Sequence, residues 1–131
     1  MLSESSIHPS LPASDLARAK AWYAAKLGFS PSKEVDGTLV YSSGSSMFTI
    51  YETSSAGTAR NTAAIWVVED LDREMAELRG RGVVFEDFDI GDFKTVNGVA
   101  ADPETDSKAA WFLDSEGNTL ALSQWPASMR I

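Results

Sequence analysis

One histidine, no cysteine and nineteen acidic residues limit the chemistry open to this chain of 131 residues. Without cysteine there is no thiolate nucleophile, no zinc–thiolate site and no disulfide framework. The sequence contains no nucleophile elbow, no glycine-rich phosphate loop and no His-Asp-Ser set. Carboxylates are plentiful, but no spacing singles out an acid–base couple. His8 is therefore the side chain to weigh as a metal ligand, a ligand contact or a hydrogen-bonded structural residue.

The formal net charge of −8 is concentrated in one stretch, residues 86–106, which we call the acidic segment. It holds seven acids (86, 87, 89, 92, 102, 104 and 106) against Lys94 alone, and so carries −6. A solvated loop that aids solubility is the usual meaning of such a run. A rim that attracts a cationic ligand is the more specific interpretation. Either way, the acidity argues against nucleic acid as a partner, because phosphates would repel it.

Length and composition favour one globular domain, residues 1–131, with 44% hydrophobic residues. The longest apolar run, Ala63–Val68, is too short to cross a membrane. Met1–Ser6 carries none of the basic residues that a signal peptide has. We therefore expect a cytoplasmic protein without a membrane partner.

Two predicted helices, each opened by an acid–leucine pair, divide the chain into similar halves. The pairs are Asp15-Leu16 and Asp70-Leu71. Ser14 or Asp15 is the expected N-cap of the first helix, and Gly28 its end. Gly80 or Gly82 is expected to end the second helix. An internal repeat of this kind predicts two modules of one design.

Around each helix the hydrophobic period changes to two, which predicts strands. The expected strands are Ile7–Ala13, Thr38–Tyr41, Met47–Tyr51, Ala63–Val68, Ala109–Leu113 and Thr119–Ser123, with weaker ones at 30–35 and 83–88. Residues 114–118 carry a hairpin signal, and residues 89–108 form a long connection. Each half is thus a strand, a helix and three strands, at about 7–55 and 62–125.

These paired modules resemble the vicinal oxygen chelate superfamily, which includes glyoxalases, extradiol dioxygenases and fosfomycin- and bleomycin-resistance proteins. The resemblance is carried by HPSLPASDLARAKAWYAAKLGF (8–29) and KAAWFLDSEGNTLALSQ (108–124). It implies an α+β fold in which two βαβββ modules form curved mixed sheets around a cavity, with the helices outside. It also implies a homodimer.

The resemblance further implies four metal-ligand positions, which here read His8, Thr49, Ala63 and Ala121. Alanine offers no donor atom, and divalent transition metals want three or four nitrogen or oxygen donors. With a single histidine, a triad of two histidines and one carboxylate is impossible. We therefore expect neither a metal site nor another cofactor.

Strand alternation predicts which side chains line the cavity. Of the adjacent Trp111 and Phe112, one must face inward and the other toward the helix, and both are candidates. The other expected ligand-binding residues are His8, Ser10, Thr49, Tyr51, Ala63, Ile65, Thr119, Ala121 and Ser123. Small, apolar and hydroxyl groups suit an organic molecule held by shape and stacking.

Three functions remain open. The first is a metal-free binding protein resembling the bleomycin-resistance branch, whose small organic ligand could be cationic. The second is a lyase or isomerase of glyoxalase type, with an unplaced metal donor or with Tyr51 or His8 as acid–base group. The third is a non-catalytic interaction subunit, suggested by Trp125 and Met129 near the C-terminus.

Overall fold

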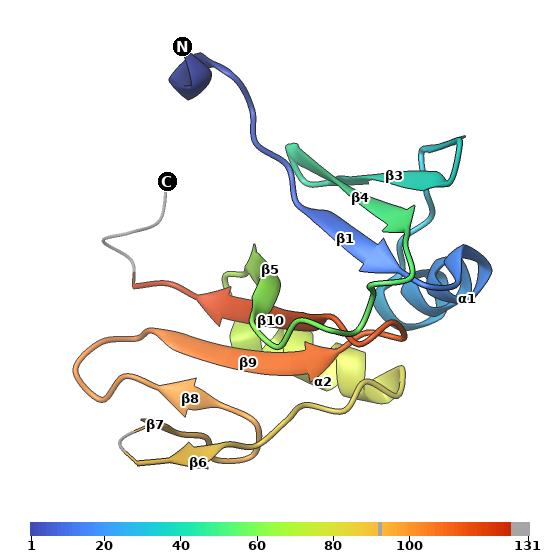
Figure 1. Cartoon of the computed structure of the whole chain (residues 1–131). Helices are drawn as coiled ribbons and strands as arrows, with labels where there is room; N and C mark the ends of the chain where they lie inside the picture. Colours follow the sequence, from blue (N-terminus) through green and yellow to red (C-terminus); the bar gives the residue numbers. More distant parts are fainter. Residues whose placement is uncertain (92, 127–131) are drawn as a thin grey trace. The chain divides into compact units, whose positions relative to one another are not determined.

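The computed structural model describes residues 1–91 and 93–126, so Asp92 of the acidic segment and Met129 lie outside the described residues. The chain divides into two units (Figure 1). The first unit takes Met1–Ala63 together with Asp114–Asn118. The second takes Ala64–Leu113 and the chain from Thr119 onward.

The first unit contains one four-stranded sheet in the order β1-β4-β3-β2. β1 runs parallel to β4, and the other neighbours are antiparallel. The strands are β1 (Ser10–Ala13), β2 (Lys33–Val35), β3 (Thr38–Ser43) and β4 (Ser46–Glu52). The helical elements are η1 (Leu2–Glu4), α1 (Leu16–Trp22) and η2 (Tyr23–Leu27), a π-helical turn that continues α1.

Local signals define α1–η2 as the sequence predicts. The Asp15 carboxylate accepts from the backbone N–H of Arg18 at 3.0 Å, so Asp15 rather than Ser14 is the N-cap. At the other end Gly28 adopts φ 77°, the left-handed conformation that suits glycine. On the apolar face of this helix, Ala19 and Tyr23 are completely buried. The rest of the core of this unit comes from Leu11, Ala13, Leu39, Tyr41, Phe48 and Ile50.

The second unit contains a sheet in the order β5-β10-β9-β8 and a separate pair, β6-β7. The strands are β5 (Thr62–Val67, begun in the first unit), β6 (Asp89–Ile90), β7 (Phe93–Lys94), β8 (Ala100–Ala101), β9 (Lys108–Leu113) and β10 (Thr119–Gln124). The helix α2 (Leu71–Gly80) is capped by Asp70, whose carboxylate accepts from the N–H of Arg73 at 3.1 Å. The core of the second unit comes from Leu71, Met75, Val83, Phe85, Ala110, Phe112, Leu120, Ala121 and Leu122.

The expected strand at residues 83–88 is wrong. Val83 and Phe85 are buried and Val84 is 79% exposed, so the apolar alternation is real. However, this stretch forms one isolated bridge, Phe85 with Phe112, and no ladder. The third strand beside β9 is instead β8, inside the expected connection 89–108. The first strand also begins later than expected, at Ser10, which leaves His8 before it.

The fold class is confirmed: α+β, with two four-stranded sheets that do not close into barrels, each packed against a helix on one face. No helix within residues 1–91 and 93–126 has the length and apolar character needed to cross a membrane.

Candidate functional site

The sheet of the first unit has one buried face and one open face. Along β4, Phe48 and Ile50 are buried, whereas Met47 and Tyr51 are 41% and 39% exposed. Thr49 lies between them and is partly exposed. This is the alternation that the sequence predicts, and it puts Thr49 and Tyr51 on the open face.

Polar side chains on and beside this open face bind one another. Ser10 lies opposite Thr49 in the β1–β4 register. The Thr49 hydroxyl donates to the Ser10 hydroxyl at 3.0 Å. His8 is exposed, and its Nδ1 donates to the Met47 carbonyl at 3.1 Å. The imidazole is thus tied to the β4 backbone, as expected of a hydrogen-bonded residue at a strand edge, and Nε2 is left for other contacts.

In the second unit, the register of the β9–β10 hairpin sets its open face. Trp111 lies opposite Ala121, and Ala109 lies opposite Ser123. Since paired residues share a face, Trp111, Ala109 and Ser123 lie on one side of the hairpin, which Thr119 shares by parity. These four side chains are partly exposed, whereas Ala121 on the same side is buried, at 2% exposure. On β5, Ile65 is 55% exposed, and Ala63 is on the same side of the strand by the same parity.

The adjacent Trp111 and Phe112 separate as strand alternation requires. Phe112 is fully buried and meets Phe85 edge to face, with ring centroids 5.6 Å apart. Its ring therefore belongs to the core of the second unit, and this structure removes Phe112 from the surface that a ligand could touch. Trp111 is the partly exposed member of the pair.

An aromatic cluster connects the acidic segment to Trp111 of β9. The Trp111 ring lies 5.8 Å from that of Phe88 and 5.5 Å from that of Phe93, both edge to face. The ring centroids of Phe88 and Phe93 are 6.1 Å apart; Phe88 directly precedes β6 in the chain, and Phe93 begins β7. The sequence signal for this cluster is weak, since two phenylalanines five residues apart predict no contact with a tryptophan further along the chain.

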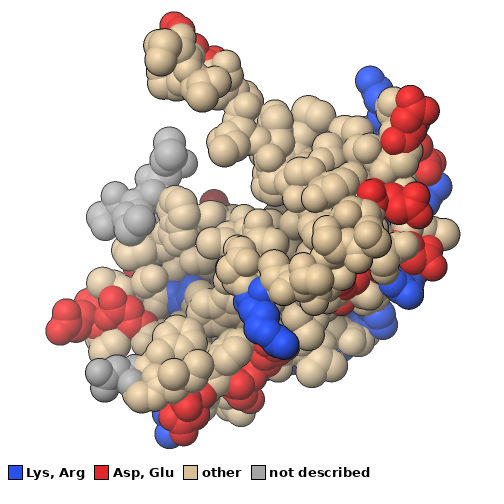
Figure 2. Space-filling model, viewed as in Figure 1, with Lys and Arg blue, Asp and Glu red and all other residues tan. Residues whose placement is uncertain are grey.

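Beside this cluster lies a pocket of about 280 Å³, which we call the Trp111 pocket. Its apolar wall comes from Phe93, Trp111 and three alanines of β8 and β9. Its polar lining residues are Lys94, Asp102, Ser107 and Lys108. The acidic segment therefore borders a pocket, although the lining holds two lysines and one aspartate. Figure 2 shows acidic side chains gathered over the part of the second unit that carries β6, β7 and β8.

The four positions that the family uses for metal ligands do not fit a metal ion in this chain. Ala63 and Ala121 carry no donor atom. The Thr49 hydroxyl is bonded to Ser10, and one ring nitrogen of His8 to a carbonyl group. In the described part of the chain, no three His, Asp or Glu side chains gather in a way that could hold a metal ion.

The turn Asp114–Asn118 holds buried carboxylates that resemble an acid–base couple. The Tyr23 hydroxyl donates to Asp114 at 2.6 Å, and burial together with this carboxylate raises the pKa of Tyr23. Glu116 accepts from Arg18 at 2.8 Å and from the backbone N–H groups of Ser14 and Asp15. The Arg18 hydrogen bond is the main cause that lowers the pKa of Glu116 to about 2. Fully bonded and buried, these groups stabilise the first unit and are not placed to exchange protons with a ligand.

The comparisons with known proteins agree with this architecture. A family described as the Glyoxalase/Bleomycin resistance protein/Dioxygenase superfamily matches residues 6–122. A search of curated proteins finds no match.

Solved structures with the same fold include a glyoxalase family protein from Enterococcus faecalis, 23% identical, with a TM-score of 0.71 over 95% of this chain and 100% of that one. A bleomycin-binding protein complexed with bleomycin is 19% identical, with a TM-score of 0.67 over 92% and 98%. A bleomycin resistance determinant encoded on the transposon Tn5 is 19% identical, with a TM-score of 0.68 over 92% and 97%. The family match over residues 6–122 and the two sheet-and-helix units together show that the chain belongs to the Glyoxalase/Bleomycin resistance protein/Dioxygenase superfamily.

Proposed function

We propose that this chain is a metal-free protein that binds a small organic molecule. The observation that carries the proposal is the Trp111 pocket, an open depression of about 280 Å³ with aromatic rings and alanine side chains on its wall. Aromatic and small apolar side chains beside a few polar groups are typical of sites that hold organic ligands by shape and stacking.

The metal-free part of the proposal rests on the chemistry of the donor set. Three of the four family ligand positions are Thr49, Ala63 and Ala121. A threonine hydroxyl is a weak ligand for divalent transition metals, and an alanine is none. Residues on the exposed faces of the two sheets stay predicted ligand contacts, each within its own unit: His8, Ser10, Thr49, Tyr51 and Ala63 in the first, and Ile65, Thr119 and Ser123 in the second. Ala121 is only 2% exposed and offers a ligand little surface.

A bleomycin-binding relative supports the binding of an organic molecule by this fold, because its structure is a complex with bleomycin. The charge of the ligand of the present chain is a separate question. The lining of the Trp111 pocket contains Lys94, Lys108 and Asp102 and does not itself favour a cation. A preference for cations would therefore come from the longer-range field of the acidic segment.

Binding is tested by isothermal titration with bleomycin and with planar aromatic compounds in cationic and neutral pairs. We expect Trp111→Ala to weaken binding by about tenfold or more, since stacking on an aromatic anchor contributes on the order of 1.5 kcal/mol. Val84→Ala is the control, because Val84 is 79% exposed, lies on none of the strands that carry predicted contacts and does not line the pocket. Absence of heat with every compound, or equal losses in both variants, would contradict the proposal.

The salt dependence of binding distinguishes long-range attraction by the acidic segment from direct contacts between the ligand and the pocket. Raising the ionic strength from about 0.01 M to about 1 M shortens the Debye length from about 30 Å to about 3 Å. If the acidic segment attracts the ligand, the cationic member of each pair loses its advantage in high salt and the neutral member does not change. An advantage that survives high salt would assign it to direct contacts.

Elemental analysis of untagged protein tests the metal-free assignment. A stoichiometric transition metal would overturn it and favour the alternative, a glyoxalase-type lyase or isomerase. The homodimer and the cytoplasmic location stay predictions. Sedimentation velocity at two protein concentrations tests whether the protein is a homodimer.

A further inference from the structure

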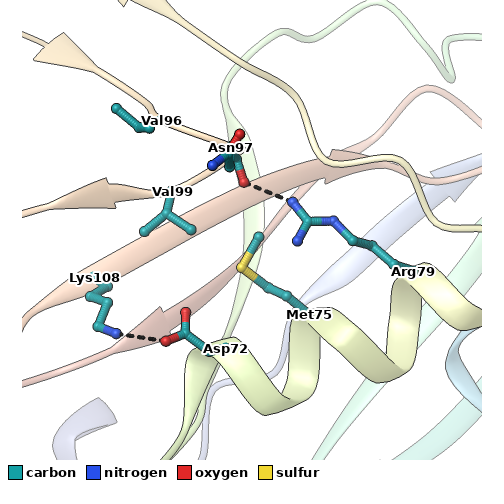
Figure 3. Close-up of a pocket in the computed structure, with 7 residues that line it drawn as sticks. All are labelled: Asp72, Met75, Arg79, Val96, Asn97, Val99 and Lys108. Atoms are coloured by element: carbon teal, nitrogen blue, oxygen red, sulfur yellow. Dashed lines mark hydrogen bonds and ion pairs between the residues drawn. The ribbon is translucent and has the colours of Figure 1, made fainter.

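A second pocket of about 280 Å³ lies between α2 and the turn that follows β7 (Figure 3). Asp72, Met75 and Arg79 line it from the helix, and Val96, Asn97 and Val99 from the turn. Among the described residues, Lys108 alone lines both this pocket and the Trp111 pocket. We call it the α2 pocket.

Helical spacing gives this pocket two different ends. Asp72, Met75 and Arg79 are three and four residues apart, so they lie on one face of α2. Seven residues of helix rise by about 10 Å, which puts Asp72 and Arg79 at opposite ends with Met75 between them. Figure 3 shows this order, with Val99 facing the middle of the pocket from the turn. The middle is therefore apolar and the ends are charged.

The wall formed by the turn is held in place by its own contacts. The Asp87 carboxylate accepts from the N–H of Gly98 at 2.7 Å and from the Thr95 hydroxyl at 2.8 Å. Gly98 adopts φ 81°, and a Cβ atom there would lie 2.9 Å from Cβ of Phe85. The close approach of the Gly98 backbone thus depends on glycine, and it brings Val99 toward Met75.

The two cations of the pocket differ in what they already bind. Lys108 pairs with Asp72 at 3.1 Å, so that end is neutralised. Arg79 donates one hydrogen bond, to the Asn97 carbonyl at 2.7 Å, and lies 5.3 Å above the centre of the Phe85 ring. Among the described residues no carboxylate is within ion-pair distance of Arg79. Its guanidinium is thus oriented by Phe85 and Asn97 and also interacts electrostatically with the Asp87 carboxylate. Its other N–H donors have no hydrogen-bond acceptor among the described residues.

We propose that the α2 pocket is a second small-molecule site that takes a small amphipathic monocarboxylate. The carboxylate binds the remaining N–H donors of Arg79, and the apolar chain lies against Val96 and Val99, with the buried Met75 as the floor of the pocket. A planar carboxylate matches the guanidinium fork. A single negative charge suits one available cation beside an acidic segment, whereas a phosphate would meet more repulsion. The volume of about 280 Å³ is below that of pockets for drug-sized ligands, so this pocket, like the Trp111 pocket, would enclose only a small molecule or one group of a larger one.

The test uses the full chain and three probes of equal chain length: hexanoate, hexanol and hexylammonium. In methyl NMR spectra we expect hexanoate to shift the Met75, Val96 and Val99 signals in a saturable manner. Hexanol should bind more weakly and hexylammonium should leave these signals unchanged. Shifts confined to residues around Trp111, no saturable shift, or equal effects of all three probes would overturn the proposal.

Paired variants of α2 test the role of the charge. Arg79→Gln should weaken hexanoate binding by about tenfold, the usual effect of losing a charge-assisted hydrogen bond. Arg73→Gln removes the same charge from the same helix outside the pocket, and it should leave the affinity within about twofold, the size of a screened surface effect. Equal losses in the two variants would assign the effect to the overall charge and refute the site. The spectra of the unchanged protein remain decisive if Arg79→Gln does not fold.

Discussion

Two buried tyrosines of the first unit, Tyr23 and Tyr41, are expected to respond in opposite directions to the loss of their hydroxyl group. Both side chains are fully buried, and their ring centroids are 5.9 Å apart in one aromatic cluster. The Tyr23 hydroxyl donates to Asp114 at 2.6 Å. The Tyr41 hydroxyl is buried and has no hydrogen-bond partner in the described part of the chain. Tyr→Phe therefore removes a hydrogen-bonded hydroxyl group at position 23 and an unsatisfied one at position 41.

The magnitudes follow from what each hydroxyl group touches. A hydrogen bond to a charged group contributes about 1.5–3 kcal/mol. After Tyr23→Phe the Asp114 carboxylate keeps the N–H groups of Glu116 and Asn118 and the Asn118 amide, so it is not left unpaired. We expect a loss of about 2 kcal/mol in the free energy of unfolding. An unsatisfied buried polar group costs about 1–3 kcal/mol, so Tyr41→Phe should stabilise the protein by about 1 kcal/mol.

The assay is urea unfolding followed by tryptophan fluorescence at neutral pH. The two variants should differ by about 3 kcal/mol, with m-values equal to that of the unchanged protein, so that the difference reports stability alone. Both tyrosines are protonated throughout, since burial raises the pKa of each, that of Tyr41 to about 12. If Tyr41→Phe destabilises the protein as much as Tyr23→Phe, the reasoning from hydrogen-bond satisfaction is refuted.

Three further predictions concern the supports of the two units. The pKa of Glu116 is about 2 when folded against an ordinary value of 4.5, so its contribution is complete above pH 4.5 and is lost as the pH falls toward 2. This contribution to the free energy of unfolding is on the order of 2–3 kcal/mol, discounted because Arg18 is half exposed. In urea unfolding, the stability of Glu116→Gln should therefore approach that of the unchanged protein near pH 2. Gly98→Ala should lower the free energy of unfolding by about 1–3 kcal/mol, whereas Gly80→Ala, which meets open space at negative φ, should not lower it in the same thermal scan. Asp70→Ala removes the N-cap of α2 and should lower stability by about 1 kcal/mol, and an unchanged unfolding midpoint would contradict this cap.

Elements with local signals are the ones that the sequence predicts well. Both helices begin at Asp15 and Asp70, because a capping carboxylate satisfies amides within its own first turn. Gly28 ends the first because left-handed backbone suits glycine. The strands of both sheets follow the period of two, which also places Thr49 and Tyr51 on an open face.

Features that depend on distant partners needed the tertiary structure. The stretch 83–88 has the alternation of a strand, but only Phe85 finds a bridging partner, in Phe112. Strand formation requires a neighbouring backbone, which a pattern within one segment cannot supply. For the same reason the contacts of Phe88 and Phe93 with Trp111 were not predicted.

The charged residues show this division most clearly. The sequence alone locates −6 of the net charge of −8 in residues 86–106, because charge is a sum over residue types. Only the tertiary structure shows that this segment borders the Trp111 pocket, and that Lys94 and Lys108 also line it. Only the tertiary structure also shows that the acids of the hairpin turn differ from those of the acidic segment. Asp114 and Glu116 are buried and accept hydrogen bonds from Tyr23 and Arg18. The field that a charge exerts, and the free energy of its burial, depend on neighbours that folding brings from far along the chain.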